Sequence, residues 1–188
     1  MSSFISEDDI EQALCTRLSQ PELGWKRITC DPSVEAQDDV SKTGRRNAAE
    51  CVLPAVLLNA LKRLNPQIDK DILAQVVADF RKNYTGTDMV DTNYKFYNQL
   101  RNGINVKVKK NGKEDFDIVR LIDFDHVENN DFHCVNQMWI KGRFRYRRPD
   151  VLLFVNGLPV VFIELKNSTV KIKEAYEKNL VSYRKDIP

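Results

Sequence analysis

The stretch RRPDVLLFVNGLPVVFIELK, from Arg147 to Lys166, contains two apolar runs that are separated by Asn156-Gly157 and bounded by charged residues. Short apolar runs around an Asn-Gly pair are typical of a β-hairpin. Asp150 precedes the first run, and Glu164 and Lys166 follow the second. Because side chains alternate faces along a strand, Glu164 and Lys166 are expected on the same side of the sheet. The hairpin therefore predicts a carboxylate and an ammonium side by side at the end of a buried strand.

The position of Asp150 relative to Glu164 depends on the length of the loop. With a two-residue loop, residue 150 would face residue 163, and the two acids would lie on opposite faces. With a three- or five-residue loop and a bulge at Gly157, residue 150 would face residue 164, roughly 4.5 to 5.5 Å away. Pro159 cannot donate to a strand ladder, which favours the longer loop. We therefore predict an odd-length loop and two adjacent carboxylates.

Two adjacent carboxylates repel each other and raise one pKa unless a cation lies between them. Mg²⁺ suits such a site, because it takes few protein oxygens, keeps several waters and accepts phosphate oxygens. Lys166 would then orient a metal-bound water or stabilise charge on the transferring phosphorus. These residues predict phosphodiester hydrolysis. The alternative is an ion pair at the end of a strand without catalysis.

Longer motifs carry a resemblance to a known family. Pro149-Asp150, followed after thirteen residues by Glu164-Leu165-Lys166, resembles the PD-(D/E)XK nuclease motif. The wider context resembles the N-terminal domain of the restriction (R) subunit of type I restriction enzymes. The similarity runs from about Ser6 to the end of the chain, and its strings are LNP (64–66), FHCVNQMWI (132–140) and RRPDVLLFVNGLPVVFIELKN (147–167).

The resemblance implies an α/β fold with a restriction-endonuclease-like core, in which α-helices flank a mixed central β-sheet. Residues 1–188 would form one endonuclease domain, the N-terminal fragment of a longer polypeptide that carries an ATP-driven DNA-translocating motor. Asp150 and Glu164 would hold Mg²⁺, the backbone carbonyl of Leu165 would complete the site, and Lys166 would assist the attacking water. Double-stranded DNA and the modification and specificity subunits would be the partners. A non-catalytic DNA-binding or subunit-docking module with the same fold is the alternative.

Three further residues are candidates for accessory roles. Glu11 lies on a helix expected over 6–19, and the family fold often places an acid from this helix near the metal. An exposed acidic face near the positive helix end is the simpler explanation. Asn179 and Tyr183, on a helix expected over 171–185, match the family's QxxxY pattern in part, since asparagine is shorter than glutamine. Tyr183 is equally well explained as a core aromatic residue.

A basic segment precedes Asp150. Lys141, Arg143, Arg145 and Arg147 share one strand parity, so an extended segment would form a basic ridge that leads to the acid. We expect Arg143, Arg145, Arg147 and Arg148 to contact DNA phosphates, which lysine and arginine neutralise without reading sequence. A solvated strand face is the alternative.

The composition fits one soluble domain of 188 residues, with 42% hydrophobic and 30% charged residues. The net charge is only +2, so any attraction to DNA must come from local clusters. The four cysteines form no CxxC pair, and neither a signal peptide nor a long apolar run occurs, which predicts reduced thiols and a cytoplasmic protein without a membrane segment. A P-loop is also absent, so ATP would bind elsewhere in the full-length protein.

The remaining elements follow from periodicity and turn residues. An apolar stretch rich in leucine and alanine predicts a helix over 48–64, and Ile72, Val76 and Phe80, spaced by four, predict another over 69–83. A third helix is expected over 88–101, ending near Gly103. Alternating residues predict a hairpin over 104–124 that turns at Asn111-Gly112. Residues 20–47 are expected to be loops around one short strand at 25–29. Phe132 to Ile140 leads into the basic segment.

Overall fold

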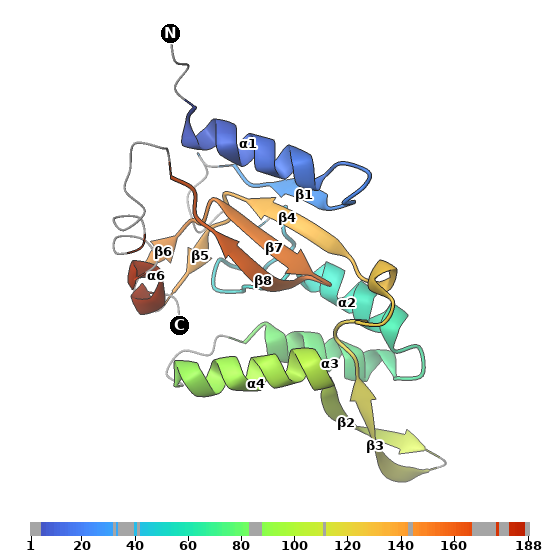
Figure 1. Ribbon diagram of the computed structural model, residues 1–188. Coiled ribbons are helices and arrows are strands. Elements are labelled where there is room, and N and C mark those ends of the chain that lie inside the picture. Colours follow the sequence, from blue (N-terminus) through green and yellow to red (C-terminus); the bar gives the residue numbers. More distant parts are fainter. Residues whose placement is uncertain are drawn as a thin grey trace.

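A mixed β-sheet occupies the centre of the protein (Figure 1). The computed structural model describes residues 5–31, 33, 40, 42–82, 88–110, 112–142, 145–166, 176 and 181–186. Within these residues, the sheet has four strands in the order β1 (Lys26–Thr29), β4 (Phe132–Asn136), β7 (Val151–Val155) and β8 (Leu158–Ile163). β1 runs parallel to β4, whereas the pairs β4–β7 and β7–β8 are antiparallel. The expected α/β fold with a mixed sheet is therefore present.

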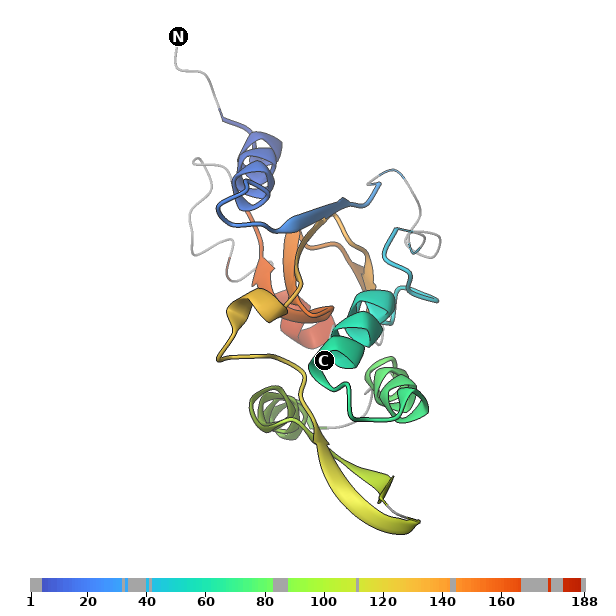
Figure 2. The same cartoon turned by 90° about the vertical axis from the view of Figure 1, so that its right-hand side faces the viewer.

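Helices cover both faces of this sheet. α1 (Glu7–Leu18) packs on one face, where Cys15 contacts a cluster that includes Cys134 and Val151. α2 (Pro54–Leu64) covers the other face and lies next to a cluster that contains Leu53 and Phe154. Figure 2 shows α1 (blue) above the sheet and α2 (teal) on its other side. The inner strands β4 and β7 are thereby largely buried, whereas the edge strands β1 and β8 are partly exposed.

A second layer lies beyond α2. It contains α3 (Lys70–Phe80), α4 (Met89–Asn102) and a hairpin of β2 (Ile104–Lys110) and β3 (Lys113–Val119), which projects away from the central sheet (Figure 1). Its core joins Leu57 and Leu61 of α2 to Leu73 of α3. The other described elements are η1 (Val127–Asn129), β5 (Ile140–Lys141), β6 (Tyr146–Arg147) and α6 (Val181–Asp186). None of the helices in the described ranges is long and apolar enough to span a bilayer.

Most predicted helices form, with shifted ends. Ser6 caps α1 through reciprocal hydrogen bonds with Asp9. The helix predicted from residue 48 begins only at Pro54, because residues 42–51 form turns around a buried carboxylate. Of the helix predicted over 171–185, Tyr176 and Val181–Asp186 are described, and Asn179 lies outside the described residues.

The carboxylate that organises residues 42–51 belongs to Glu50, whose side chain is 1% exposed. It accepts hydrogen bonds from Arg81 Nε at 2.8 Å and from the backbone N–H of Arg46 at 2.9 Å. Burial alone would raise the pKa of Glu50, but Arg81 and Arg46 outweigh it and lower this pKa to about 2. Glu50 therefore stays ionised and fastens the segment before α2 to the end of α3.

Candidate active site

A β-bulge sets the geometry of the hairpin that carries the acids. Val155 pairs with Leu158, so the loop has only two residues, Asn156 and Gly157, with φ values of 52° and 80°. The register then shifts between Leu153 and Phe154, and Val151 pairs with Ile163. The extra residue on β8 is Val160, since Phe154 pairs with Pro159 and Leu153 with Val161.

The prediction of an odd-length loop is therefore wrong, but the predicted pairing of residue 150 with residue 164 is consistent with the register. Extending the Val151–Ile163 register by one residue places Asp150 opposite Glu164. The bulge supplies the odd residue that we had assigned to the loop. Pro159 is tolerated in the ladder because β8 is an edge strand of the described sheet, where a missing N–H is not needed by a neighbour.

Asp150, Glu164 and Lys166 converge at the ends of β7 and β8. The backbone N–H of Leu165 donates to Asp150 Oδ2 at 2.5 Å. Lys166 Nζ donates to the carbonyl oxygen of Leu165 at 2.7 Å and lies 3.4 Å from Glu164 Oε1. The structure thus brings these residues together at one strand end, where they are half-buried.

The electrostatics of this group follow from burial and mutual charge. Burial and the charge of Asp150 raise the pKa of Glu164, and this outweighs the lowering by Lys166 and by a hydrogen bond from Tyr183. Burial would lower the pKa of Lys166, but the charges of Glu164 and Glu7 outweigh it, so this pKa is raised. Lys166 is therefore a cation at neutral pH, and Glu164 carries its charge at an energetic cost.

Glutamine in place of Glu164 is expected to stabilise the protein in the absence of divalent metal. Because the pKa of Glu164 is raised in the folded state, its ionised form opposes folding. The contribution of Glu164 to stability is greatest below its pKa in the unfolded chain and is lost as the pH rises through its pKa in the folded protein. Glu164→Gln removes this loss and should raise the Tm at pH 7.5 by about 2–4 °C, roughly 1 kcal/mol. Thermal unfolding in a chelator measures the shift. The exposed Glu128 provides the control, and a lower Tm for Glu164→Gln would contradict the pKa argument.

α1 contributes two acids from its sheet-facing side. Glu7 Oε2 lies 3.4 Å from Lys166 Nζ, which makes Glu7 a member of the charged group. Glu11 is buried, and it accepts bonds from the side-chain amides of Asn136 at 2.8 Å and Gln137 at 2.5 Å. Glu11 is therefore not part of an exposed acidic face, and it lies one helical turn from Glu7.

Gln137 links Glu11 to the acid of the hairpin. Its φ of 61° ends β4 and turns its backbone N–H toward the carbonyl oxygen of Asp150, at 3.0 Å. A non-glycine residue in this region is uncommon, and such residues cluster at functional sites. Sequence reasoning missed Gln137, because no residue pattern signals this conformation.

Tyr183 covers the site from α6. Its ring packs against Phe162 at a centroid distance of 4.7 Å, and the Arg147 guanidinium lies 5.5 Å from the ring centroid. Burial and the charge of Glu164 raise the pKa of the Tyr183 hydroxyl, which stays protonated and donates to Glu164. Tyr183 is thus both a packed aromatic residue and a partner of the site.

The predicted basic ridge does not run in one extended line. Gly142 N donates to the carbonyl oxygen of Arg145, and Lys141 pairs with Tyr146, so the segment folds back as the β5–β6 hairpin. Arg143 lies outside the described residues. Arg145 is exposed, and the Arg148 guanidinium lies 5.1 Å from the Trp139 ring centroid. Lys141 and Arg147 therefore lie on opposite arms of a hairpin before Asp150 rather than along one extended ridge.

The residues at the site fit a hard divalent cation. The Lys166 ammonium lies among three oxygens, those of Leu165, Glu164 and Glu7, which shows that this strand end attracts a cation. Within the described residues, no three His, Cys, Asp or Glu side chains gather closely enough to hold a metal. A metal here would rely on two carboxylates, a backbone carbonyl and non-protein oxygens, as Mg²⁺ often does.

The hairpin thus places two carboxylates and a lysine ammonium at one end of the sheet, and comparison with known proteins gives the family. The profile described as "Type I restriction enzyme R protein N terminus" matches residues 4–188, so the chain belongs to this family.

Two relatives extend the comparison. The "Type I restriction enzyme HindI endonuclease subunit" of Haemophilus influenzae is 39% identical over 166 residues, which cover 87% of this chain and 15% of that protein. A Methanocaldococcus jannaschii protein, also named as a type I restriction enzyme endonuclease subunit, is 31% identical over 152 residues, or 77% of this chain and 14% of that protein. The matched region is thus a small part of these relatives.

Proposed function

We propose that this chain is the Mg²⁺-dependent DNA endonuclease domain of a type I restriction–modification R subunit, and that it hydrolyses phosphodiester bonds. The observation that carries the proposal is the convergence of Asp150, Glu164 and Lys166 at one strand end, in a member of this family. The raised pKa of Glu164 supports it, because two carboxylates that repel each other are a site for a cation.

Each residue has a role that its contacts support. Asp150 and Glu164 hold the metal, which supplies Lewis acidity and an activated water when bound. The backbone N–H groups of Leu165 and Gln137 fix Asp150, while Tyr183 orients Glu164. The Leu165 carbonyl bonds to Lys166, and its second lone pair is available to the metal.

Lys166 acts as a cation in this proposal. Because its pKa is raised, Lys166 is already protonated at neutral pH and cannot accept a proton from the attacking water. Its ammonium instead orients the attacking water and stabilises the negative charge that develops on the phosphorus oxygens. Glu7 and Glu11 are accessory acids: Glu7 holds the ammonium, and Glu11 lies behind Asp150 through Gln137.

DNA phosphates would meet the arginines beside the site. Arg145 is exposed, and Arg147 and Arg148 are held by aromatic rings, so their guanidinium groups are positioned before DNA arrives. Arg143 is the fourth member of this proposed contact. The proposal extends to a cytoplasmic protein whose polypeptide continues into an ATP-driven DNA-translocating motor that binds the ATP. Modification and specificity subunits would be its partners.

Plasmid cleavage by the full-length subunit, assembled with its partner subunits, tests the proposal. In Mg²⁺ and ATP, Asp150→Asn and Glu164→Gln are expected to lower cleavage by about 10³-fold or more, because several kcal/mol of metal stabilisation are lost. Mn²⁺ binding, measured by calorimetry, should weaken at least about tenfold in both variants. Asp79→Asn, a surface acid paired with Lys82, is the matched control. If both site variants cleave like wild type, a non-catalytic DNA-binding or docking module takes the place of the nuclease.

A further inference from the structure

A hollow of about 870 Å³ lies at the end of the sheet that faces away from Asp150. It is bounded by the C-terminal end of α4, the segment after β3, and the β7–β8 hairpin. We call it the apolar groove, and its principal lining residues are Tyr97, Phe124, Val127, Phe132, Val155 and Val160.

Large apolar side chains of this groove are exposed. Phe124 is 62% exposed, Val127 57% and Tyr97 54%. On the same helix, Val90 and Tyr94 precede Tyr97 at helical spacing and are also exposed, so the apolar surface continues along α4. Contiguous exposed apolar surface of this kind marks an interaction site in soluble proteins.

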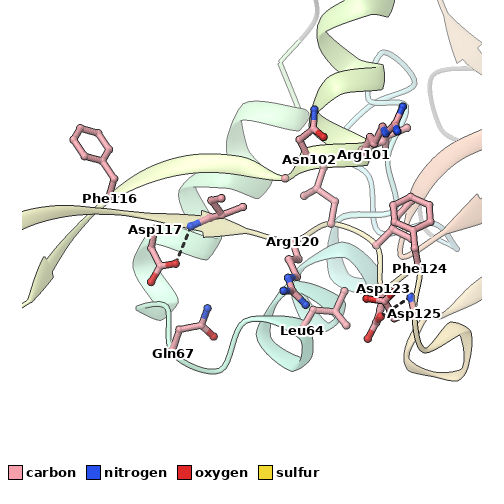
Figure 3. Close-up of a pocket in the computed structure, with 15 residues that line it drawn as sticks. Leu64, Gln67, Arg101, Asn102, Phe116, Asp117, Arg120, Asp123, Phe124 and Asp125 are labelled. Atoms are coloured by element: carbon pink, nitrogen blue, oxygen red, sulfur yellow. Dashed lines mark hydrogen bonds between the residues drawn. The ribbon is translucent and has the colours of Figure 1, made fainter.

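A second hollow of about 730 Å³ adjoins the groove and shares residues 122–125 with it. Figure 3 shows this hollow, with Phe124, Asp123 and Asp125 at one end and Phe116 projecting from the β2–β3 hairpin at the other. Phe116 is 64% exposed. The two hollows together form a recess that runs from the sheet to the projecting hairpin.

The charges of the groove favour a protein over a nucleic acid. As far as the chain is described, the charged side chains that line the groove are Arg101, Asp123 and Asp125. Asp123 accepts from the backbone N–H of His126 at 3.0 Å and from the Asn129 amide at 2.8 Å. One cation against two carboxylates does not attract a phosphate backbone. An apolar polypeptide surface is the complementary ligand.

We propose that the apolar groove binds the polypeptide that follows residue 188 in the full-length R protein. This inference rests on the proposed function, which makes the chain the first part of such a protein. The family profile describes the N terminus of the R protein, and the matched segments occupy only 15% and 14% of two relatives. A segment on the same polypeptide has a high effective concentration, and a permanent partner permits an apolar interface.

The position of the groove also suits this occupant. Phe132 lines it at one end of β4 and Gln137 lies beyond the other end, so about 17 Å of strand separates the groove from the candidate active site. A docked segment therefore leaves Asp150 and the arginines open to DNA. It would also cover the exposed bulge residue Val160 of the hairpin that carries Glu164, which links the docked segment mechanically to the site.

Site-specific photocrosslinking in the full-length subunit tests the proposal. Benzoylphenylalanine is placed at Phe124, or at Tyr97, in otherwise wild-type protein without DNA, Mg²⁺ or the other subunits. Irradiation is expected to yield intramolecular crosslinks from these positions to peptides beyond residue 188. Ile5, which is 60% exposed before α1, is the matched control, and its crosslinks to those peptides should be at least about fivefold fewer.

Two other outcomes overturn the proposal. Crosslinks from Phe124 and Tyr97 that go only to a second copy assign the groove to that copy. Crosslinks that appear only in a second arm, in which the modification and specificity subunits are added, assign it to those subunits. Equal yields from Ile5 and Phe124 show that the groove has no specific occupant. Because the readout needs neither metal nor cleavage, a failed nuclease assignment leaves these results interpretable.

Discussion

Replacing Lys166 by methionine is expected to reduce plasmid cleavage by the assembled enzyme about 10²- to 10³-fold, while Mn²⁺ binding stays as tight as in wild type or becomes tighter. The variant keeps the apolar stem but removes the ammonium that lies 3.4 Å from both Glu164 and Glu7. A divalent ion beside the carboxylates then meets less positive charge. Nicking assays in Mg²⁺ and calorimetry with Mn²⁺ measure the two effects separately.

Cleavage and Mn²⁺ binding together distinguish the role of Lys166 from that of the two acids. Asp150→Asn should lose cleavage and metal binding together, whereas Lys166→Met should lose only cleavage. Lys82→Met, which removes a surface ion pair with Asp79, is the control. Cleavage by Lys166→Met within a few-fold of wild type would rule out a role for the ammonium. Because the pKa of Lys166 is raised, the wild-type pH–rate profile should show no lysine ionisation below the ordinary lysine range.

The hairpin shows how far its sequence predicts the site. Apolar runs around Asn156-Gly157 predicted the strands, and the charged residues at their ends predicted the convergence that the structure contains. The bulge escaped prediction because it depends on packing: Leu158 is fully buried, while Val160 and Val161 are both exposed. Two consecutive apolar residues look alike in a sequence, whether they are buried or bulged outward.

The prediction of a basic ridge was wrong for a different reason. A basic ridge from Lys141 to Arg147 requires an extended chain, and Gly142 lies within this segment. The hydrogen bond from Gly142 N to Arg145 O reverses the chain there. A glycine between charged residues is a turn signal, so the sequence contained the information needed to expect a hairpin.

For the acids of α1, the sequence predicts the helix face but not the partners. Glu7, Glu11 and Cys15 recur at a spacing of four, which places them on one helix face, and Cys15 is fully buried. The sequence therefore permits both acids to face the sheet. Their partners were not predictable, because Gln137 reaches Glu11 from a left-handed backbone conformation that only the fold imposes.

Alanine at Gly157 is expected to destabilise the protein by about 3 kcal/mol, which lowers the Tm by roughly 6–12 °C. Gly157 has a φ of 80°, and an added Cβ would lie 2.6 Å from the Leu53 carbonyl oxygen and 2.8 Å from Leu57 N. Both are backbone atoms at the start of α2, and Leu53 N also donates to Gly157 O at 2.8 Å. The hairpin must therefore move away from α2. Urea unfolding measures the loss, and cleavage should fall with it, because the turn sets the register of the acids.

Gly112 provides a matched control for this effect. It follows an asparagine in the turn between β2 and β3 and has a φ of 76°, but an added Cβ meets no atom within 4 Å among the described residues. Gly112→Ala therefore incurs only the left-handed backbone penalty of about 1–2 kcal/mol. The difference between the stability losses of the two variants measures the contribution of the close contact between the β7–β8 hairpin and α2. Equal losses of stability would show that this approach does not hold the hairpin, and that the bulge alone fixes the position of Glu164 opposite Asp150.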